Sequence, residues 1–293
     1  MKYKSLLRNL ALGAILLSPL RADEMLYVGL TDTGWQVFHC DLVTMKQKQL
    51  TKSLGDKRTP IYSSAYKAVL YRGSKGRIWS VDSEGKESVL VDIIGCADFT
   101  VDGQDIYFTR LVTGNSKRQH LWKAAGERPF KEMELIYRPE KGSIRQPHFR
   151  DGKFLATHIW TVGEELVVVI DPNAQPVMSA LTAPGELASY PRWINDQSAV
   201  FSYSINDQGN YDIYTVDVLS AVSSPQTSAK ALLKGTEHSE FSCSLNTAED
   251  LYYFERLDDK GIWSIASMDL EGESVTELPF KEQVKEPFVF KSE

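Results

Sequence analysis

Asp212-Ile213-Tyr214-Thr215-Val216-Asp217 is a strand-like segment in which apolar and aromatic residues alternate with polar ones before a closing aspartate. Similar segments recur along the chain, as Gln36-Val37-Phe38-His39-Cys40-Asp41, Arg77-Ile78-Trp79-Ser80-Val81-Asp82, His120-Leu121-Trp122-Lys123-Ala124, Leu166-Val167-Val168-Val169-Ile170-Asp171 and Gly261-Ile262-Trp263-Ser264-Ile265-Ala266. Successive copies lie 41 to 49 residues apart, counted between Phe38, Trp79, Trp122, Val168, Tyr214 and Trp263. A period of this length indicates a repeat architecture with one small structural unit per copy.

A second repeat runs out of phase with the first and places a proline or small residue two positions before an aromatic one. Its copies are Pro60-Ile61-Tyr62, Ala97-Asp98-Phe99, Pro147-His148-Phe149, Pro191-Arg192-Trp193 and, more weakly, Pro287-Phe288-Val289. The remaining copy, Glu240-Phe241-Ser242-Cys243, has lost both features. Turn residues such as Asp102-Gly103 and Asp151-Gly152 follow, and Asp-Gly between β-rich runs favours a hairpin. Each unit therefore predicts four short strands and no helix.

Six units of four strands predict an all-β fold, a six-bladed β-propeller over residues 23–293. The chain enters this pattern at the second strand of a blade, residues 25–30, and leaves it at a first strand, residues 286–290. We therefore expect the C-terminal strand to pair with the three N-terminal strands. This pairing would close the ring and remove exposed strand edges.

The most regular unit carries a resemblance to a known family. Pro191-Arg192-Trp193-Ile194-Asn195-Asp196, Val200-Phe201-Ser202-Tyr203-Ser204 and the segment 212–217 are similar to the Pro-x-Trp-Ser-Pro-Asp-Gly, Ile-x-Phe-x-Ser and Asp-Ile-Tyr-x-x-Asp elements of TolB-like propellers. The resemblance covers nearly all of residues 25–293 and implies the fold alone, because this repeat serves translocation-system proteins, peptidases and many other exported proteins. TolB carries an α/β domain ahead of its propeller and the peptidases carry a hydrolase domain after it. We expect neither here, so the resemblance transfers neither the Tol–Pal role nor peptidase activity.

The first 22 residues have the pattern of a secretory signal peptide. Three cations, Lys2, Lys4 and Arg8, precede an uncharged apolar run over residues 10–17, which is too short to span a bilayer. Small residues and Ala22 follow, so we expect cleavage after Ala22 and a periplasmic or secreted protein. The alternative is a retained N-terminal anchor, because Leu20 is not the small residue preferred three positions before the cut.

Charge and composition exclude several classes of function. Removal of residues 1–22 takes away four cations and no acidic residue, which moves the formal net charge from −6 to −10. Since nucleic-acid binding draws its affinity from clustered Lys and Arg, no nucleic-acid partner is expected. No later apolar run is long enough to cross a membrane, so no membrane span is expected in the mature chain. The three cysteines, Cys40, Cys96 and Cys243, leave at least one thiol unpaired, and we expect all three to be small buried residues.

Catalytic and metal-binding motifs are missing from the sequence. The five histidines stand in no His-x-His or His-Glu-x-x-His pattern, and there is no Gly-x-Ser-x-Gly elbow or phosphate-binding glycine loop. The aspartates that recur at the ends of the repeat segments, Asp41, Asp82, Asp171, Asp217 and Asp269, are expected to cap turns. We therefore predict no metal site and no cofactor, and favour a protein without catalytic activity.

Polar residues next to the inner strand of each blade are the candidates for ligand binding at the rim of the central channel. They are Arg58, Arg145, Gln146, His148, Tyr190, Glu240 and Glu286. Their mixed character favours a polar binding surface over a metal cage, although solvated loop ends would have the same composition. The leading hypothesis is an exported propeller that binds an envelope protein or a small polar ligand. The alternative is a hydrolase or lyase acting on carbohydrate or lactone in the channel, which needs carboxylates and histidines that converge there.

Overall fold

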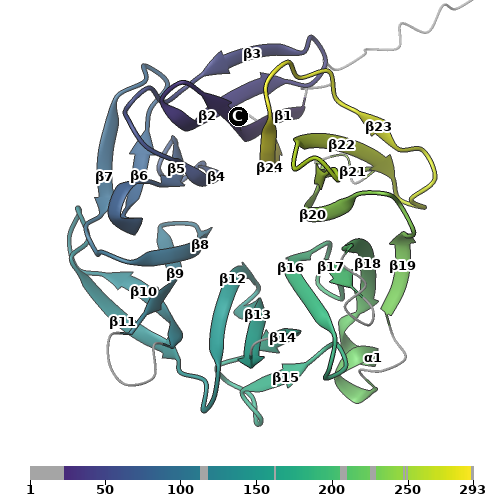
Figure 1. The fold of residues 1–293 in the computed structure, drawn as a ribbon. Coiled ribbons are helices and arrows are strands. Elements are labelled where there is room, and N and C mark those ends of the chain that lie inside the picture. Colours follow the sequence, from purple (N-terminus) through teal and green to yellow (C-terminus); the bar gives the residue numbers. More distant parts are fainter. Residues whose placement is uncertain are drawn as a thin grey trace, which may run out of the picture.

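The chain forms a ring of β-sheets around a central axis (Figure 1). The computed structural model describes residues 23–112, 118–161, 163–204, 210–224, 229–246, 248 and 250–291. The predicted signal peptide, residues 1–22, lies outside these ranges. Strands β4, β8, β12, β16, β20 and β24 stand next to the axis, and the later strands of each sheet lie progressively further out (Figure 1).

Four sheets contain four strands each, and a fifth contains eight. The first sheet holds β24 (Val284–Lys291), β1 (Asp23–Thr31), β2 (Gly34–Asp41) and β3 (Lys46–Gln49). The next holds β4 (Arg58–Ser63), β5 (Ala68–Arg72), β6 (Ile78–Val81) and β7 (Glu87–Val91), with a 3-10 turn at Ser74–Gly76. The third holds β8 (Cys96–Asp102), β9 (Asp105–Leu111), β10 (Gln119–Ala125) and β11 (Glu132–Tyr137). Another four-stranded sheet holds β20 (Ser239–Leu245), β21 (Leu251–Leu257), β22 (Trp263–Asp269) and β23 (Thr276–Glu277).

The eight-stranded sheet consists of two consecutive antiparallel units. One unit is β12 (Ser143–Arg150), β13 (Lys153–Thr161), β14 (Glu164–Ile170) and β15 (Met178–Ala180). The other is β16 (Leu187–Trp193), β17 (Ser198–Ser204), β18 (Asp212–Asp217) and β19 (Ala229–Leu233). A single parallel bridge, Glu165 to Leu187, joins them. The sheet count thus differs from the six separate sheets that the sequence predicts, because the backbones of these two units touch at this one point.

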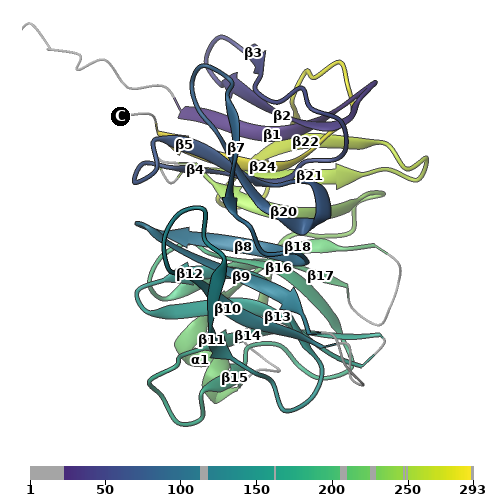
Figure 2. The ribbon, with the colours of Figure 1, turned by 90° about the vertical axis from the view of Figure 1, so that its left-hand side faces the viewer.

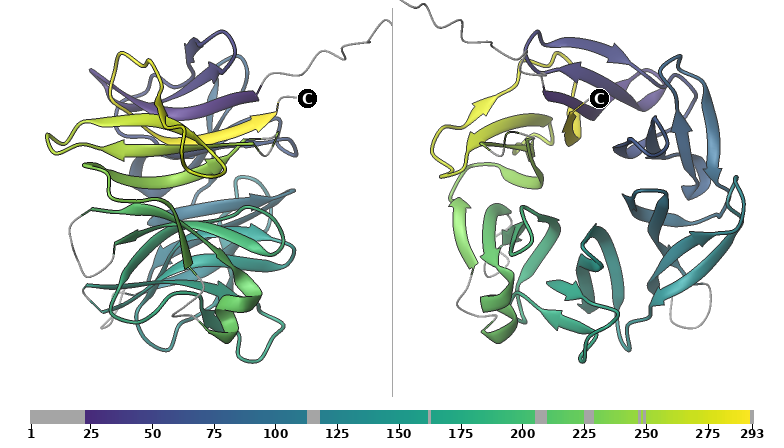
Figure 3. Two further views of the ribbon diagram at one scale, coloured as in Figure 1. Left: turned by 90° about the vertical axis from the view of Figure 1, so that its right-hand side faces the viewer. Right: turned by 180° about the vertical axis from the view of Figure 1, so that it is seen from behind.

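The last strand of the chain completes the sheet that the first three strands begin. β24 runs antiparallel to β1, with Asp23 opposite Lys291 at one end and Gly29 opposite Val284 at the other. In both side views the start of β1 and the end of β24 emerge together on the same face of the ring (Figures 2 and 3). Pairing between segments so far apart in sequence links the two ends of the described chain directly.

Burial is greatest in the strands second from the axis, which have a packed sheet on each face. Met25, Leu26, Tyr27 and Val28 of β1 are all fully buried, whereas the outer strand β3 is polar and largely exposed. Long apolar runs are typical of strands that are covered on both sides. The core is therefore divided into clusters between neighbouring sheets, one for each contact around the ring.

Turn chemistry follows the sequence predictions closely. Between β12 and β13, Asp151 and Gly152 both have positive φ, 47° and 79°, as a two-residue hairpin turn requires. The carboxylates of the recurring aspartates accept backbone N–H groups two to five residues further along, which confirms the capping role of Asp41, Asp82, Asp171, Asp217 and Asp269. The expectation of no helix was wrong at one place, since the short helix α1 (Val218–Ser223) begins where Asp217 accepts the N–H of Ser220 at 2.7 Å.

Candidate functional site

Every inner strand is interrupted by a β-bulge of two residues. The break in pairing register falls at residues 59–60, 97–98, 146–147, 190–191, 242–243 and 286–287. In five of these bulges the first residue has a positive φ of 49° to 58°, namely Thr59, Gln146, Tyr190, Ser242 and Glu286. Proline follows in four of them, because a bulge leaves a position that need not donate to the ladder.

The positions of the bulges show that one repeat copy, at residues 97–99, is aligned incorrectly from sequence. The pairing register places Asp98, and not Ala97, at the position that Pro60 occupies in β4, so Phe99 corresponds to Ile61. Proline is recognisable from sequence, whereas a bulge with no proline leaves only the spacing of apolar residues to align. The sequence alignment of this copy is therefore wrong by one residue.

Side chains of one sheet accept hydrogen bonds from the bulge of the next sheet around the ring. The left-handed backbone turns the bulge N–H away from its own sheet and toward the preceding one. The bonds are Thr59 N–H to Glu286 Oε2 (2.5 Å), Gln146 N–H to Asp98 Oδ2 (3.2 Å), Tyr190 N–H to Gln146 Oε1 (2.9 Å) and Glu286 N–H to Glu255 Oε2 (3.1 Å). Many polar groups at the axis are thus held in fixed positions by the scaffold itself.

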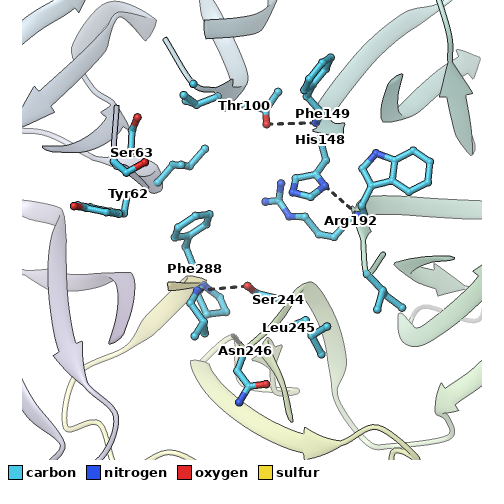
Figure 4. Close-up of a pocket in the computed structure, with 18 residues that line it drawn as sticks. Tyr62, Ser63, Thr100, His148, Phe149, Arg192, Ser244, Leu245, Asn246 and Phe288 are labelled. Carbon is cyan, nitrogen blue, oxygen red and sulfur yellow. Dashed lines mark hydrogen bonds between the residues drawn. The ribbon is translucent and has the colours of Figure 1, made fainter. Parts of the chain in front are cut away.

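Three cavities that share lining residues lie beside the inner strands. The largest, about 400 Å³, lies at the end of the inner strands and is lined by His148, Phe149, Arg192 and Phe288 among others (Figure 4). The second, about 160 Å³, shares Arg192 and Phe288 with the first. The third, also about 160 Å³, shares Tyr190 with the second. Polar and apolar residues together line all three cavities, which we call the axial passage because neighbouring cavities share lining residues.

The structure brings together six of the seven residues that the sequence analysis nominated. Arg58, Arg145, Gln146, Tyr190 and Glu286 line the second cavity, and His148 lines the first. Glu240 is not among the residues that line these cavities. It is fully buried, where one carboxylate oxygen accepts the hydroxyl of Thr236 at 2.6 Å and lies 3.4 Å from Arg256.

Most charges in the second cavity are paired. Arg58 Nε contacts a carboxylate oxygen of Glu286, and Arg145 Nε lies 3.8 Å from Asp98 Oδ2. Glu255 lies buried behind Glu286, and burial together with the Glu286 carboxylate raises the pKa of Glu255 above its usual range. Burial likewise raises the pKa of Tyr190, so its phenol stays protonated. These groups are together nearly neutral, and Arg72 and Arg192 add two positive charges to the lining of the same cavity.

Arg192 is the functional candidate that the sequence analysis missed. It occupies the inner-strand position held elsewhere by Ile61, Phe99, His148, Ser244 and Phe288, as the pairing registers show. An arginine at a repeat position that is otherwise mostly apolar was the signal that could have identified it. Its guanidinium lies beside the His148 imidazole, and both reach into the open centre of the largest cavity (Figure 4).

The surroundings of His148 set both its tautomer and its charge. Its Nδ1 accepts the backbone N–H of Trp193 at 3.0 Å, so the ring proton resides on Nε2. Burial, and after it the positive charges of Arg192 and Arg150, hold the pKa of His148 well below its usual range. The imidazole is therefore neutral at pH 7 and presents an N–H donor next to the Arg192 cation.

The cysteines, the metal-ligating side chains and the helices were also subjects of sequence predictions. Cys40, Cys96 and Cys243 are all free and buried, which confirms their expected structural role. Within the described ranges, no three His, Cys, Asp or Glu side chains are grouped so that they could hold a metal ion. None of the helices in that part of the chain has the length and apolar character needed to cross a bilayer.

The radial sheets and the lined central passage define this chain as a β-propeller with a polar axial site. Its sequence matches no known protein family and no curated protein. Its fold is similar to that of a putative TolB from Agrobacterium tumefaciens, at 12% identity and a TM-score of 0.69, over 92% of this chain and 97% of that one. TolB from Acinetobacter baumannii gives 15% identity and the same TM-score over 91% of this chain and 66% of its own length.

A third similar structure is oligogalacturonate lyase from Vibrio parahaemolyticus, at 15% identity and a TM-score of 0.58, over 86% of this chain and 73% of that one. At these identities each likeness concerns the fold alone. This chain spans about two thirds of the Acinetobacter TolB, so the activities and partners of these proteins do not transfer with it.

Proposed function

We propose that this protein is an exported, six-bladed, TolB-like propeller that binds a small polar ligand, or a polar segment of a cell-envelope protein, in its axial passage without chemical change. Export rests on the cations, the short apolar run and the small residues within positions 1–22. The binding function rests on the site itself.

Six blades are supported by the strand pattern. The units β12–β15 and β16–β19 each repeat the inner-to-outer order of the four-stranded sheets, and only one bridge connects them. Counting them as two blades gives the number of sequence repeats. The pairing of β24 with β1 supports a ring that is closed by the C-terminal strand.

The observation that carries the binding proposal is the largest cavity, with its mixture of fixed polar groups and apolar walls. Its volume of about 400 Å³ falls within the range of small-ligand sites. Hydrogen bonds between blades hold its polar wall in place, for example Phe149 N–H to Thr100 Oγ1 (3.4 Å) and Val289 N–H to Ser244 Oγ (3.4 Å). A preformed wall loses little conformational entropy when a ligand binds.

The test compares a blocked passage with an open one. Ser64 is exposed and lines the mouth of the largest cavity, so Ser64→Trp obstructs the mouth with little cost to the fold. Ser83 is exposed in the turn between β6 and β7 and lines none of the three cavities, which makes Ser83→Trp the matched control. Residues 23–293 of each protein are exposed to the protein pool and the low-mass pool of an envelope extract, and bound species are identified by mass spectrometry.

We expect the wild type and Ser83→Trp to retain the same species, and Ser64→Trp to lose it. Binding in the passage would be refuted if the wild type retained no species, or if Ser64→Trp retained as much as the wild type.

The alternative of a carbohydrate or lactone hydrolase or lyase is examined with the same three proteins. Turnover of a uronate oligomer or a lactone by the wild type, lost in Ser64→Trp, would replace the binding proposal with an enzymatic one.

A further inference from the structure

We infer that the ligand of the axial passage carries a carboxylate group, and that Arg192 together with His148 binds it. This inference rests on the proposed binding function and adds the chemical class of the ligand. It is carried by the position of an unpaired cation in a preformed cavity.

The Arg192 guanidinium has no partner, a feature that it shares, among the described arginines lining the cavities, with Arg72 of the second cavity. Arg58, Arg145 and Arg150 each face a carboxylate, at Glu286, Asp98 and Asp196 respectively. In the part of the chain that the structure describes, no group lies within hydrogen-bond or ion-pair distance of the Arg192 guanidinium. A half-buried guanidinium with five unused N–H donors is costly to desolvate, and an incoming anion would compensate that cost.

The neighbouring imidazole completes the donor set. Because His148 Nδ1 is occupied by the Trp193 N–H, its Nε2–H is the group left to donate, and no described residue accepts it. Figure 4 shows this ring beside the guanidinium, with both side chains facing the cavity. Two parallel N–H groups from Arg192 and one from His148 suit the two oxygens of a carboxylate.

The charges around the site favour one negative charge over two. Arg192 supplies the single positive charge among the residues that line the largest cavity, since His148 is neutral. In the second cavity Arg58 and Arg145 are balanced by Glu286 and Asp98, and Arg72 adds one further positive charge. Those carboxylates lie just beyond Arg192, in the second cavity, and would repel a second negative charge on the ligand. The site therefore fits a monocarboxylate better than a phosphate dianion.

The remainder of the ligand would rest on the apolar part of the same cavity. Ile61, Phe149, Leu245 and Phe288 line it, opposite or beside the two donors. About 400 Å³ leaves room for a body the size of a monosaccharide or a substituted aromatic ring. The occupant that we infer is a compact monocarboxylate with at least one apolar face.

The experiment compares acids with their neutral counterparts. Binding of phenylacetate, phenylacetamide, galacturonate, galactose and inorganic phosphate to residues 23–293 is measured by isothermal titration and by ligand-observed NMR. We expect at least one of the two acids to bind 10-fold or more tightly than its neutral counterpart, and phosphate to bind more weakly than that acid. Arg192→Gln should weaken binding of the acid at least 10-fold, and Arg192→Lys should weaken it by a smaller factor because the cation is retained.

Arg77→Gln is the matched control, since Arg77 is a cation whose guanidinium pairs with Asp92 and which lines none of the three cavities. It should change the affinity less than 2-fold, and thermal unfolding of each variant shows whether the fold persists. The inference would be overturned if the acid and its neutral counterpart bound equally, or if no acid bound. It would also be overturned if the control variant lost as much affinity for the acid as Arg192→Gln. If Arg192→Gln still retains the species that the wild type and Ser83→Trp retain from the envelope extract, the passage binds a ligand but the assignment of a carboxylate is wrong.

Discussion

Replacement of Phe290 by alanine tests whether the C-terminal strand seals the ring. Phe290 belongs to β24 and is only 9% exposed. Its ring stacks on Tyr62 of the neighbouring sheet, with centroids 4.6 Å apart, and it packs in one cluster with Leu26, Val28 and Tyr71. The side chain therefore joins the last strand of the chain to the first sheet and to the second.

The size of the effect follows from this burial. Truncation of a buried phenylalanine costs about 3 to 5 kcal/mol, of a total stability of about 5 to 15 kcal/mol for a typical domain. At about 2 to 4 °C for each kcal/mol in a domain of this size, the midpoint of thermal unfolding should fall by about 6 to 20 °C. Only a β24 that is seated against β1 and β4 gives a loss of this size.

Urea unfolding followed by tryptophan fluorescence measures the loss, with circular dichroism as a second probe of two-state behaviour. Leu54→Ala is the control, because Leu54 is 82% exposed and its removal should cost less than about 0.5 kcal/mol. A free energy of unfolding for Phe290→Ala that equals that of Leu54→Ala would show that β24 is not packed in the ring, and the closure would have to be abandoned.

Three further predictions concern buried polar and sulfur groups. Burial raises the pKa of Glu240 from 4.5 to about 7, so the folded chain binds this proton more tightly than the unfolded chain. The free energy of unfolding should therefore fall by about 2 to 3 kcal/mol as the pH rises from about 4.5 to beyond 7. Urea unfolding at pH 5 and pH 8 should show this loss in the wild type but not in Glu240→Gln; an identical pH dependence in the two proteins would contradict it. Gln146→Ala leaves the Tyr190 N–H and the Thr157 hydroxyl without their acceptor and should lower the free energy of unfolding by about 1 to 3 kcal/mol. Gln146→Glu keeps an acceptor and should lower it less; equal losses in the two variants would mean that the hydrogen bond between sheets contributes little. A thiol reagent should label no cysteine in the native protein and three after denaturation, since Cys40, Cys96 and Cys243 are buried and burial raises the pKa of each thiol; rapid labelling of the native protein would refute this.

Local features of this protein could be predicted from sequence because they depend on neighbouring residues. Asp151-Gly152 forms its hairpin turn because both residues tolerate a positive φ, and the aspartates that end the repeat segments cap turns only two to five residues away. The alternation of apolar residues located the strands, and the repeat period located the units. Where proline was missing, at Ala97 and Asp98, the alignment slipped by one residue because a bulge has no other local signal.

The all-β class, the repeat and the pairing of segments 25–30 and 286–290 could be predicted from the residues alone. Which polar side chains face the axis could be learned only from the fold, since that depends on how bulges on separate strands turn toward their neighbours. The fold separated Glu240, buried beside Arg256, from the candidates at the passage, and it placed Arg192 next to His148 although 43 residues lie between them. An arginine without a carboxylate is invisible in a linear chain, because pairing is a property of distances across blades.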